Sequence, residues 1–397
     1  MTMLSDALFD SFESSVRETE SADSLPPACY VDPDFFAFEK EAIFFREWLC
    51  VGRVDWAANP GDYYTFSHSG EPIIVARSLD GELHAMSAVC QHRAMLVAEG
   101  AGNARGFVCP YHHWSYALDG TLVGAPAMSR TCNFDKADHG LPKLRIETWQ
   151  GFVFVNFDPA ALPLAPRLAA LESVMANYGI ADLVGPRPGA PATYQWNWKV
   201  MFENNNDGYH ANRLHHGPLH DIVPSALASF PELPADTAGY YRLNGSTHPD
   251  ASFNATLKAV FPVFDKLTDE ERNRVLFVNL PPSLSMVITT DMVLFLILDA
   301  QAADRHALTM APLVTRESMA DPLFEHRMRM NEDAVREIVT QDLDVDLAVQ
   351  KGLNSRFAPR GRYSWQEGAQ RQFNLWLVDR YRDGWTRQGG GGGSAVR

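Results

Sequence analysis

The sequence predicts an α+β fold, with a small antiparallel β domain followed by a larger domain whose central antiparallel sheet is flanked by helices. Short strand-like runs separated by turn dipeptides fill roughly residues 47–160. A long aliphatic, β-rich segment covers about residues 274–314, and helical spacing precedes and follows it. Strands that are grouped apart from helices are typical of α+β proteins.

Length and composition limit the class of protein. At 397 residues the chain is longer than one hydrophobic core comfortably supports, so two domains are expected. The net charge of −15 argues against nucleic acid or an anionic membrane as partner. An acidic N-terminus and the lack of a long apolar run favour a cytoplasmic protein without a signal peptide or membrane span. The five cysteines are then expected to be thiols or metal ligands and not disulfides.

The elements are predicted in chain order from local patterns. Helical spacing after an Asp-Pro start predicts a helix over about residues 35–45, and Ser-Gly and Asp-Gly turns predict hairpins from there to about residue 160. The segment 193–216 begins as a strand and becomes helical near Phe202. Residues 325–353 and 365–385 read as two more helices. We therefore expect four segments: residues 1–46 packing with the second domain, 47–160, 161–386, and a disordered Gly-rich tail at 387–397.

Two short segments combine cysteine with histidine. Cys90-x-His92 and Cys109-x-x-His112 each follow an apolar strand. Thiolates and imidazoles together suit zinc, iron or an iron–sulfur cluster. A structural zinc site is the main alternative, but zinc knuckles usually place two cysteines in one arm. One Cys and one His in each arm suit a [2Fe–2S] cluster in which one iron has two Cys ligands and the other has two His ligands.

These segments resemble the Rieske family closely. The similar pattern is Cys-x-His, a gap of sixteen residues, and Cys-Pro-Tyr-His followed by Trp and a Tyr-x-Leu-Asp-Gly turn. The resemblance implies a Rieske [2Fe–2S] cluster bound by Cys90, His92, Cys109 and His112. His113 departs from the pattern, because its position is often Gly in the family. We interpret His113 as a bystander on the loop surface and as the competing ligand candidate.

Histidine is concentrated in one further segment, FENNNDGYHANRLHHGPLH. Asp207 and His210 are three residues apart and would share a helix face. His210 and His215 are five apart, which on a regular helix separates them by about 140°. They can bind one metal only if the helix widens, as in a π-bulge, or ends between them. The metal-free alternative is a pair of solvent-facing histidines at the end of a helix.

The same segment is similar to the mononuclear iron motif of Rieske non-haem iron oxygenases, through Asn197-Trp198-Lys199, Glu203-Asn204, Asp207-Gly-Tyr209-His210 and His215. The resemblance implies that His210 and His215 bind Fe(II) together with one carboxylate, a ligand set that leaves positions for O₂ and substrate. His216 and His220 match no ligand position, and we interpret them as structural or pocket-lining.

The carboxylate and a bridging acid are also implied by the resemblance. In the family the carboxylate precedes a Val-Gln pair in a late helix, which selects Asp342 at eight residues before Gln350; Asp344 and Asp346 are the alternatives. Asp207 corresponds to the acid that links an iron His to a Rieske His of the neighbouring subunit, here His210 to His112. This link implies a head-to-tail ring, most often a homotrimer.

The resemblance implies the oxygenase component of a multicomponent system, which receives NAD(P)H electrons through a ferredoxin or flavin reductase and uses O₂ to hydroxylate a small hydrophobic, aromatic substrate. The short chain favours monooxygenation or oxidative N- or O-dealkylation, and cis-dihydroxylation of an aromatic ring is the alternative. A non-catalytic Rieske electron-transfer protein and a zinc-containing binding protein are the alternatives of other classes. The candidate pocket residues are Phe253, Phe261, Phe264, Met286, Met292, Leu294 and Phe295.

Overall fold

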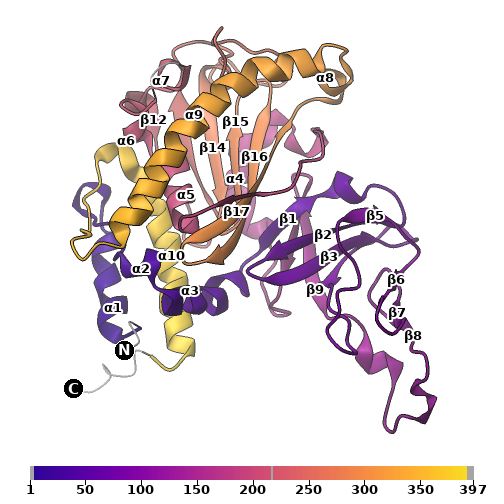
Figure 1. The fold of residues 1–397 in the computed structure, drawn as a ribbon. Helices are drawn as coiled ribbons and strands as arrows, with labels where there is room; N and C mark the ends of the chain where they lie inside the picture. The colour runs from indigo at the N-terminus through magenta and orange to yellow at the C-terminus, as the bar shows by residue number, and fades with distance from the viewer. Residues whose placement is uncertain (1–3, 216–217, 391–397) are drawn as a thin grey trace. The chain divides into compact units, whose positions relative to one another are not determined.

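The computed structural model describes residues 4–215 and 218–390, and the chain divides into two compact units. One unit comprises residues 45–162, and the other comprises residues 1–44 together with 163–397. Each unit contains a seven-stranded antiparallel sheet, which confirms the predicted α+β class (Figure 1). The predictions for His216 and for tail residues 391–397 lie outside the described residues.

The smaller unit is built from hairpins. Its main sheet has the order β1-β10-β9-β4-β3-β2-β5, and a second sheet has the order β6-β7-β8. The hairpin between β2 and β3 turns at Ser69 and Gly70, both with positive φ, as the Ser-Gly signal predicts. The strands are β1 Leu49–Arg53, β2 Asp62–His68, β3 Glu71–Arg77, β4 Leu83–Ser87, β5 Ala101–Asn103, β6 Phe107–Val108, β7 Ser115–Tyr116, β8 Leu122–Gly124, β9 Lys143–Trp149 and β10 Phe152–Asn156.

The larger unit has one sheet of order β11-β17-β16-β15-β14-β13-β12. Strands β14 to β17 form an antiparallel meander over the aliphatic segment, as predicted. Its strands are β11 Ala192–Tyr194, β12 Ala228–Ser229, β13 Tyr240–Gly245, β14 Arg274–Leu280, β15 Leu284–Ile288, β16 Val293–Ala302 and β17 Arg305–Leu313.

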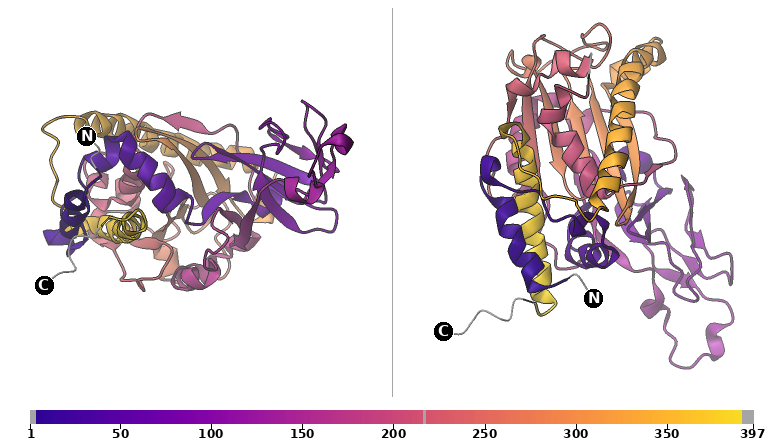
Figure 2. Two further views of the ribbon diagram at one scale, coloured as in Figure 1. Left: turned by 90° about the horizontal axis from the view of Figure 1, so that it is seen from below. Right: turned by 60° about the vertical axis from the view of Figure 1, so that its left-hand side comes forward.

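Helices cover this sheet and pack at its end. The long helix α9 crosses one face of the sheet, and α10 lies beside the N-terminal α1 (Figures 1 and 2). Within the described residues, every helix is too short or too polar to cross a membrane. The helices are α1 Asp6–Asp10, α2 Ala28–Val31, α3 Pro33–Glu39 with a π-helical turn at Lys40–Phe44, α4 Ala169–Met175, α5 Trp198–Asn206, α6 Gly208–Ala211, α7 Pro218–Ile222, α8 Arg316–Ala320, α9 Phe324–Leu353 and α10 Gly368–Arg387.

Helix α5 begins earlier than the sequence pattern predicts. Its first residue is Trp198 and not a residue near Phe202, because the side chain of Asn197 accepts a hydrogen bond from the Lys199 N–H at 2.9 Å and caps the helix. This start places Lys199 on the buried face of α5, where it forms an ion pair with Glu39 of α3.

Within the larger unit, the Lys199–Glu39 pair joins the N-terminal helix α3 to α5. The Lys199 Nζ atom lies 2.7 Å from Glu39 Oε1, and neither side chain is exposed to solvent. Glu39 also accepts hydrogen bonds from Trp198 Nε1 at 3.2 Å and from the hydroxyl of Tyr381 on α10 at 2.5 Å. These three donors satisfy the buried Glu39 carboxylate. Because they come from α5 and α10, Glu39 connects α3 to both helices.

We expect Lys199→Met to lower the free energy of unfolding by about 3–5 kcal/mol, because it leaves the Glu39 carboxylate buried without its cation. Urea denaturation followed by circular dichroism measures the change. Lys351→Met on the exposed face of α9 is the matched control, and we expect it to change stability by no more than about 0.5 kcal/mol. Equal stability of the two variants would contradict a structural role for the buried pair.

Candidate metal centres

The two Cys/His segments of the smaller unit fold into loops of the same design. In each, the cysteine N–H donates to the carbonyl oxygen five residues later, at 2.9 Å for Cys90 and 2.8 Å for Cys109. In each, the carbonyl oxygen of the cysteine accepts the N–H four residues later at 3.0 Å, and that fourth residue, Ala94 or His113, has a φ of 57°. Two similar turns therefore present one cysteine and one histidine each.

The loops bring the two histidines together. His92 Nδ1 and His112 Nδ1 are 3.1 Å apart, and both cysteines are buried. Nitrogen atoms this close together could both bind one ion with bonds of about 2.1 Å, so the imidazole pair fits one iron. The buried thiols are the donors available to a second iron, as a Rieske cluster requires. Burial and the charges of His92 and Arg93 lower the pKa of His112, which favours the neutral imidazole that binds metals.

The sulfur ligand candidates have a supporting residue that the sequence patterns did not single out for this role. The Tyr116 hydroxyl lies 3.2 Å from Cys90 Sγ and accepts a hydrogen bond from the Gln91 N–H at 3.1 Å. Burial, together with Cys90, raises the pKa of Tyr116, so its hydroxyl keeps its proton and can donate to a thiolate. Hydrogen bonds to cluster sulfurs are one means by which a protein adjusts a reduction potential.

His113 is exposed and occupies the left-handed backbone region. We expect His113→Gly to leave the visible spectrum of the cluster unchanged and to increase stability by up to about 1 kcal/mol, because glycine adopts positive φ without steric cost. Absorbance and thermal melting measure the two effects. His112→Gly is the matched variant and should lose the cluster spectrum. Loss of the spectrum in His113→Gly would instead make His113 the ligand.

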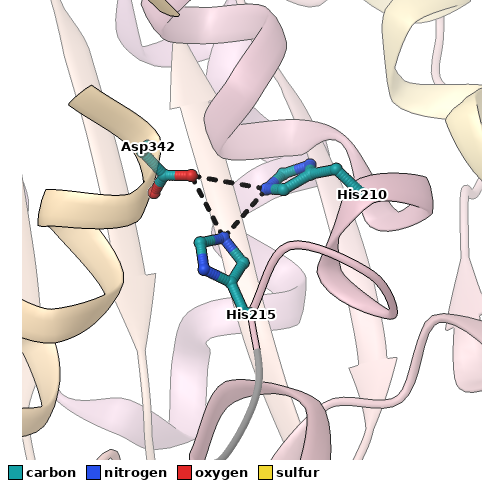
Figure 3. A group of neighbouring side chains, drawn as sticks. All are labelled: His210, His215 and Asp342. Atoms are coloured by element: carbon teal, nitrogen blue, oxygen red, sulfur yellow. Dashed lines mark hydrogen bonds and ion pairs between the residues drawn. The ribbon is translucent and has the colours of Figure 1, made fainter. Parts of the chain in front are cut away.

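The helix that carries the second group ends between its two histidines. Helix α5 stops at Asn206, and the Asp207 side chain caps α6 by accepting the Tyr209 N–H at 2.5 Å. Helix α6 stops at Ala211, so His215 follows a turn and points back toward His210 (Figure 3). Of the two local geometries that would bring the histidines together, the structure has a helix end and not a π-bulge.

His210, His215 and Asp342 converge on one point (Figure 3). His215 Nε2 lies 3.1 Å from both His210 Nε2 and Asp342 Oδ1, and His210 Nε2 lies 3.7 Å from Asp342 Oδ1. Three ligands on one face of an ion with bonds of about 2.1 Å are separated by about 3 Å, so these donor atoms are spaced as one metal ion needs. Two imidazoles and one carboxylate suit Fe(II) with open positions.

Other side chains orient these donors. The Asp207 carboxylate lies 3.1 Å from His210 Nδ1, and the Gln341 amide oxygen lies 2.8 Å from His215 Nδ1. Each contact places a proton on Nδ1 and leaves Nε2 free to bind a metal. Burial lowers the pKa of His215, but the hydrogen bond and the charge of Asp342 outweigh it and raise the pKa. The sequence reasoning missed Gln341, whose place beside Asp342 gives no signal of its own.

The neighbouring aspartates of α9 have different surroundings. Asp344 is exposed, whereas Asp346 is buried and accepts a hydrogen bond from Asn204 Nδ2 at 3.1 Å. Burial, and then the charge of Asp342, raise the pKa of Asp346 to about 8, so it is mostly protonated at pH 7. Asn204 also donates to Asp342 Oδ1 at 3.3 Å, and it therefore holds the two acids at fixed positions.

The spacing between Asp342 and Gln350 has a structural reason. The buried Gln350 side chain accepts the Asn197 N–H at 2.8 Å and donates to the Tyr30 carbonyl oxygen at 3.3 Å. These bonds fix α9 against the start of α5, about two turns beyond Asp342. The bonds thereby help to fix Asp342 relative to α5 and to the segment with His210 and His215 that follows it.

A cavity of about 620 Å³ adjoins the His210, His215 and Asp342 side chains. One wall is the face of the sheet and another is α9. Phe253, Met292 and Leu294 line it, as the sequence suggested. Met286 and Phe295 do not, because they alternate along β15 and β16 with the lining residues Val287 and Leu294 and so point to the opposite face. The other two candidates outside the lining set, both buried in the core, are Phe261 and Phe264.

A Cys/His β domain followed by a domain with a His₂–Asp group defines an iron-dependent oxidoreductase subunit. Residues 47–145 match the Rieske [2Fe-2S] domain, and residues 180–383 match the ring hydroxylating alpha subunit (catalytic domain). The chain belongs to this family: it is a Rieske non-haem iron oxygenase alpha subunit.

Several known proteins are similar to this chain. The glycine betaine monooxygenase oxygenase subunit of Chromohalobacter salexigens is 35% identical over 54% of this chain and 48% of its own length. The anthranilate 1,2-dioxygenase large subunit of Acinetobacter baylyi is 34% identical over 47% of this chain and 41% of its own. The chain thus spans about half the length of the curated relatives it matches. A crystal structure of a quaternary ammonium Rieske monooxygenase shares the fold, with a TM-score of 0.78 at 23% identity, over 93% of this chain and 98% of that one.

Proposed function

We propose that this chain is the oxygenase component of a multicomponent Rieske non-haem iron oxygenase that hydroxylates a small molecule with a hydrophobic body. The observation that carries the proposal is the convergence of His210, His215 and Asp342 beside an apolar cavity. When both groups are bound, Fe(II) supplies O₂ activation and the [2Fe–2S] cluster supplies single electrons that derive from NAD(P)H.

In this proposal Cys90, His92, Cys109 and His112 hold the cluster, and His210, His215 and Asp342 hold the iron. Asp207 and Gln341 keep the two iron histidines in the tautomer that presents Nε2. The apolar side chains of the sheet and of α9 exclude water from the cavity and position the substrate carbon that reacts. The chain's own contribution is therefore orientation and exclusion of solvent.

The proposed assembly and partners follow from the family. A ferredoxin or a flavin reductase delivers electrons in the cytoplasm, and three copies form a head-to-tail ring. In that ring Asp207 links His210 of one subunit to His112 of the next. The side chain of Asp207 is 19% exposed, so one edge of its carboxylate remains accessible.

The reaction is proposed to be monooxygenation or oxidative dealkylation. An aromatic molecule fits the apolar cavity, and the glycine betaine relative raises a quaternary ammonium compound as a second substrate class. The alternative is cis-dihydroxylation of an aromatic ring, which the anthranilate 1,2-dioxygenase relative favours. Product identification separates these reactions. Monooxygenation adds one oxygen atom to the substrate, dealkylation removes an alkyl group, and dihydroxylation gives a cis-diol.

Metal and sulfide analysis of the purified protein, with a visible spectrum and NAD(P)H-driven O₂ uptake through a surrogate reductase, tests the function. We expect about three irons per chain, acid-labile sulfide and substrate-dependent O₂ uptake. About two irons without O₂ uptake would instead indicate an electron-transfer protein. A colourless zinc protein without sulfide would indicate a binding protein.

A further inference from the structure

Among the strand residues that line the cavity, Arg242 is the charged one. Arg242 on β13 is 4% exposed and lines the cavity. It stands at one end of a row of directly paired residues that runs across the sheet through Phe277, Val287, Leu294 and Pro312. All members of the row line the cavity, because directly opposed residues of antiparallel strands share a face. The cavity floor is therefore apolar along its length and cationic at one end.

The guanidinium of Arg242 is held in place by stacking. Its Cζ atom lies 3.9 Å from the centre of the Phe277 ring. Gly208, the first residue of α6, leaves room for it: a Cβ atom at Gly208 would lie 3.1 Å from Arg242 Nη1. Stacking covers one planar face of a guanidinium and leaves its N–H groups directed outward in the plane, where they can bind a planar anion.

These N–H groups have no acceptor within the described parts of the chain. Among these described residues, the buried Nε atom of Arg242 has no hydrogen-bond partner, and no guanidinium nitrogen forms an ion pair within 4 Å. Asp207, the acid whose charge acts on Arg242, accepts hydrogen bonds from the Tyr209 N–H and from His210, and forms no ion pair with Arg242. Burial lowers the pKa of Arg242 to about 10, so the group remains charged at pH 7. A desolvated cation without a partner is costly in a folded protein unless a ligand supplies the anion.

We propose that Arg242 binds the carboxylate of the substrate, so that the cavity selects organic acids whose apolar body packs along this row of the sheet. This inference rests on the proposed function, because it takes the cavity as the substrate site. It narrows the substrate class from hydrophobic molecules to hydrophobic carboxylates. Arg242 is then a specificity-determining residue, distinct from the residues proposed to bind iron.

Isothermal titration calorimetry of the holoenzyme with matched acids and amides tests the inference. The probes are benzoate and benzamide, phenylacetate and phenylacetamide, and hexanoate and hexanamide, with tetramethylammonium as a cationic probe. We expect at least one acid to bind at least roughly tenfold more tightly than its amide, because a guanidinium–carboxylate pair is charge-assisted. No preference for any acid, or tighter binding of the cation, would overturn the inference.

Variants identify the residue responsible. Arg242→Gln should abolish the preference for the acid and leave amide binding unchanged, and Arg242→Lys should retain part of it. Arg336→Gln, a change at an exposed arginine of the same cavity, is the matched control and should keep the wild-type preference. An equal loss of the acid preference in Arg242→Gln and Arg336→Gln would indicate a general attraction between positive charge in the cavity and the acid. That result would reject a specific carboxylate site at Arg242.

The thermal midpoint separates ligand binding from a structural role. We expect Arg242→Gln to raise Tm without ligand, because it removes a buried charge that has no acceptor. A lower Tm with an unchanged preference for acids would make Arg242 structural. Iron and sulfide content, measured on the same samples, tests the oxygenase function separately. A wild type with about three irons and no preference for acids would reject only the role of Arg242.

Discussion

Asp342→Ala is expected to reduce iron from about three to about two atoms per chain, to leave the cluster spectrum intact and to abolish substrate oxidation. Asp342 Oδ1 lies 3.1 Å from His215 Nε2 and is the carboxylate of the described His₂–Asp group. Its loss leaves two neutral imidazoles, which bind a divalent ion far more weakly than a set that includes an anionic ligand. Metal analysis, visible absorbance and O₂ uptake measure the three effects.

The neighbouring aspartates provide matched controls. Asp344→Ala changes an exposed residue two positions away and should retain wild-type iron and activity. Asp346→Asn keeps the size of a buried side chain that is mostly protonated at pH 7, so iron should again remain bound. If Asp346→Asn loses the iron and Asp342→Ala keeps it, the carboxylate ligand has been assigned to the wrong residue of α9.

Local sequence patterns predicted the elements better than they predicted which side chains meet. The turn at Ser69-Gly70 and the helical periodicity of α9 are set by residues close together in the sequence. Hairpins and helices could therefore be predicted directly from the sequence. The start of α5 was predicted too late, because the cap at Asn197 does not alter the hydrophobic pattern. Likewise, spacing alone left open whether a π-bulge or a helix end brings His215 toward His210.

The contents of the cavity could be predicted only in part. Met286, Leu294 and Phe295 of β15 and β16 were all candidates, but the register of the sheet decides that Leu294 faces the cavity, together with Val287, and that Met286 and Phe295 face away. Arg242 could not be assigned from sequence, because one arginine in a strand resembles any other. Its proposed role depends on the contact with Phe277, which results from the pairing between β13 and β14.

Asp207→Asn is expected to leave both metals bound and to stop electrons from reaching the iron. The substitution preserves size, and asparagine caps a helix as aspartate does, so α6 and His210 should keep their places. The lost feature is the negative charge beside His210 Nδ1, 3.1 Å away. In the proposed ring this carboxylate accepts hydrogen bonds from two imidazoles on different subunits, and the neutral amide cannot replace it for both.

Stopped-flow absorbance of the chemically reduced protein mixed with O₂ measures the transfer, because reoxidation of the cluster changes its visible spectrum. We expect the rate in Asp207→Asn to fall roughly 100-fold or more, with unchanged iron and sulfide content. Hydrogen peroxide supplies oxygen together with its electrons, so substrate oxidation driven by peroxide should survive in the variant. The exposed Asp221→Asn serves as the control and should transfer electrons at the wild-type rate. Wild-type reoxidation in Asp207→Asn would rule out the bridge, whereas loss of iron would show that Asp207 holds His210 in place and does not primarily carry electrons.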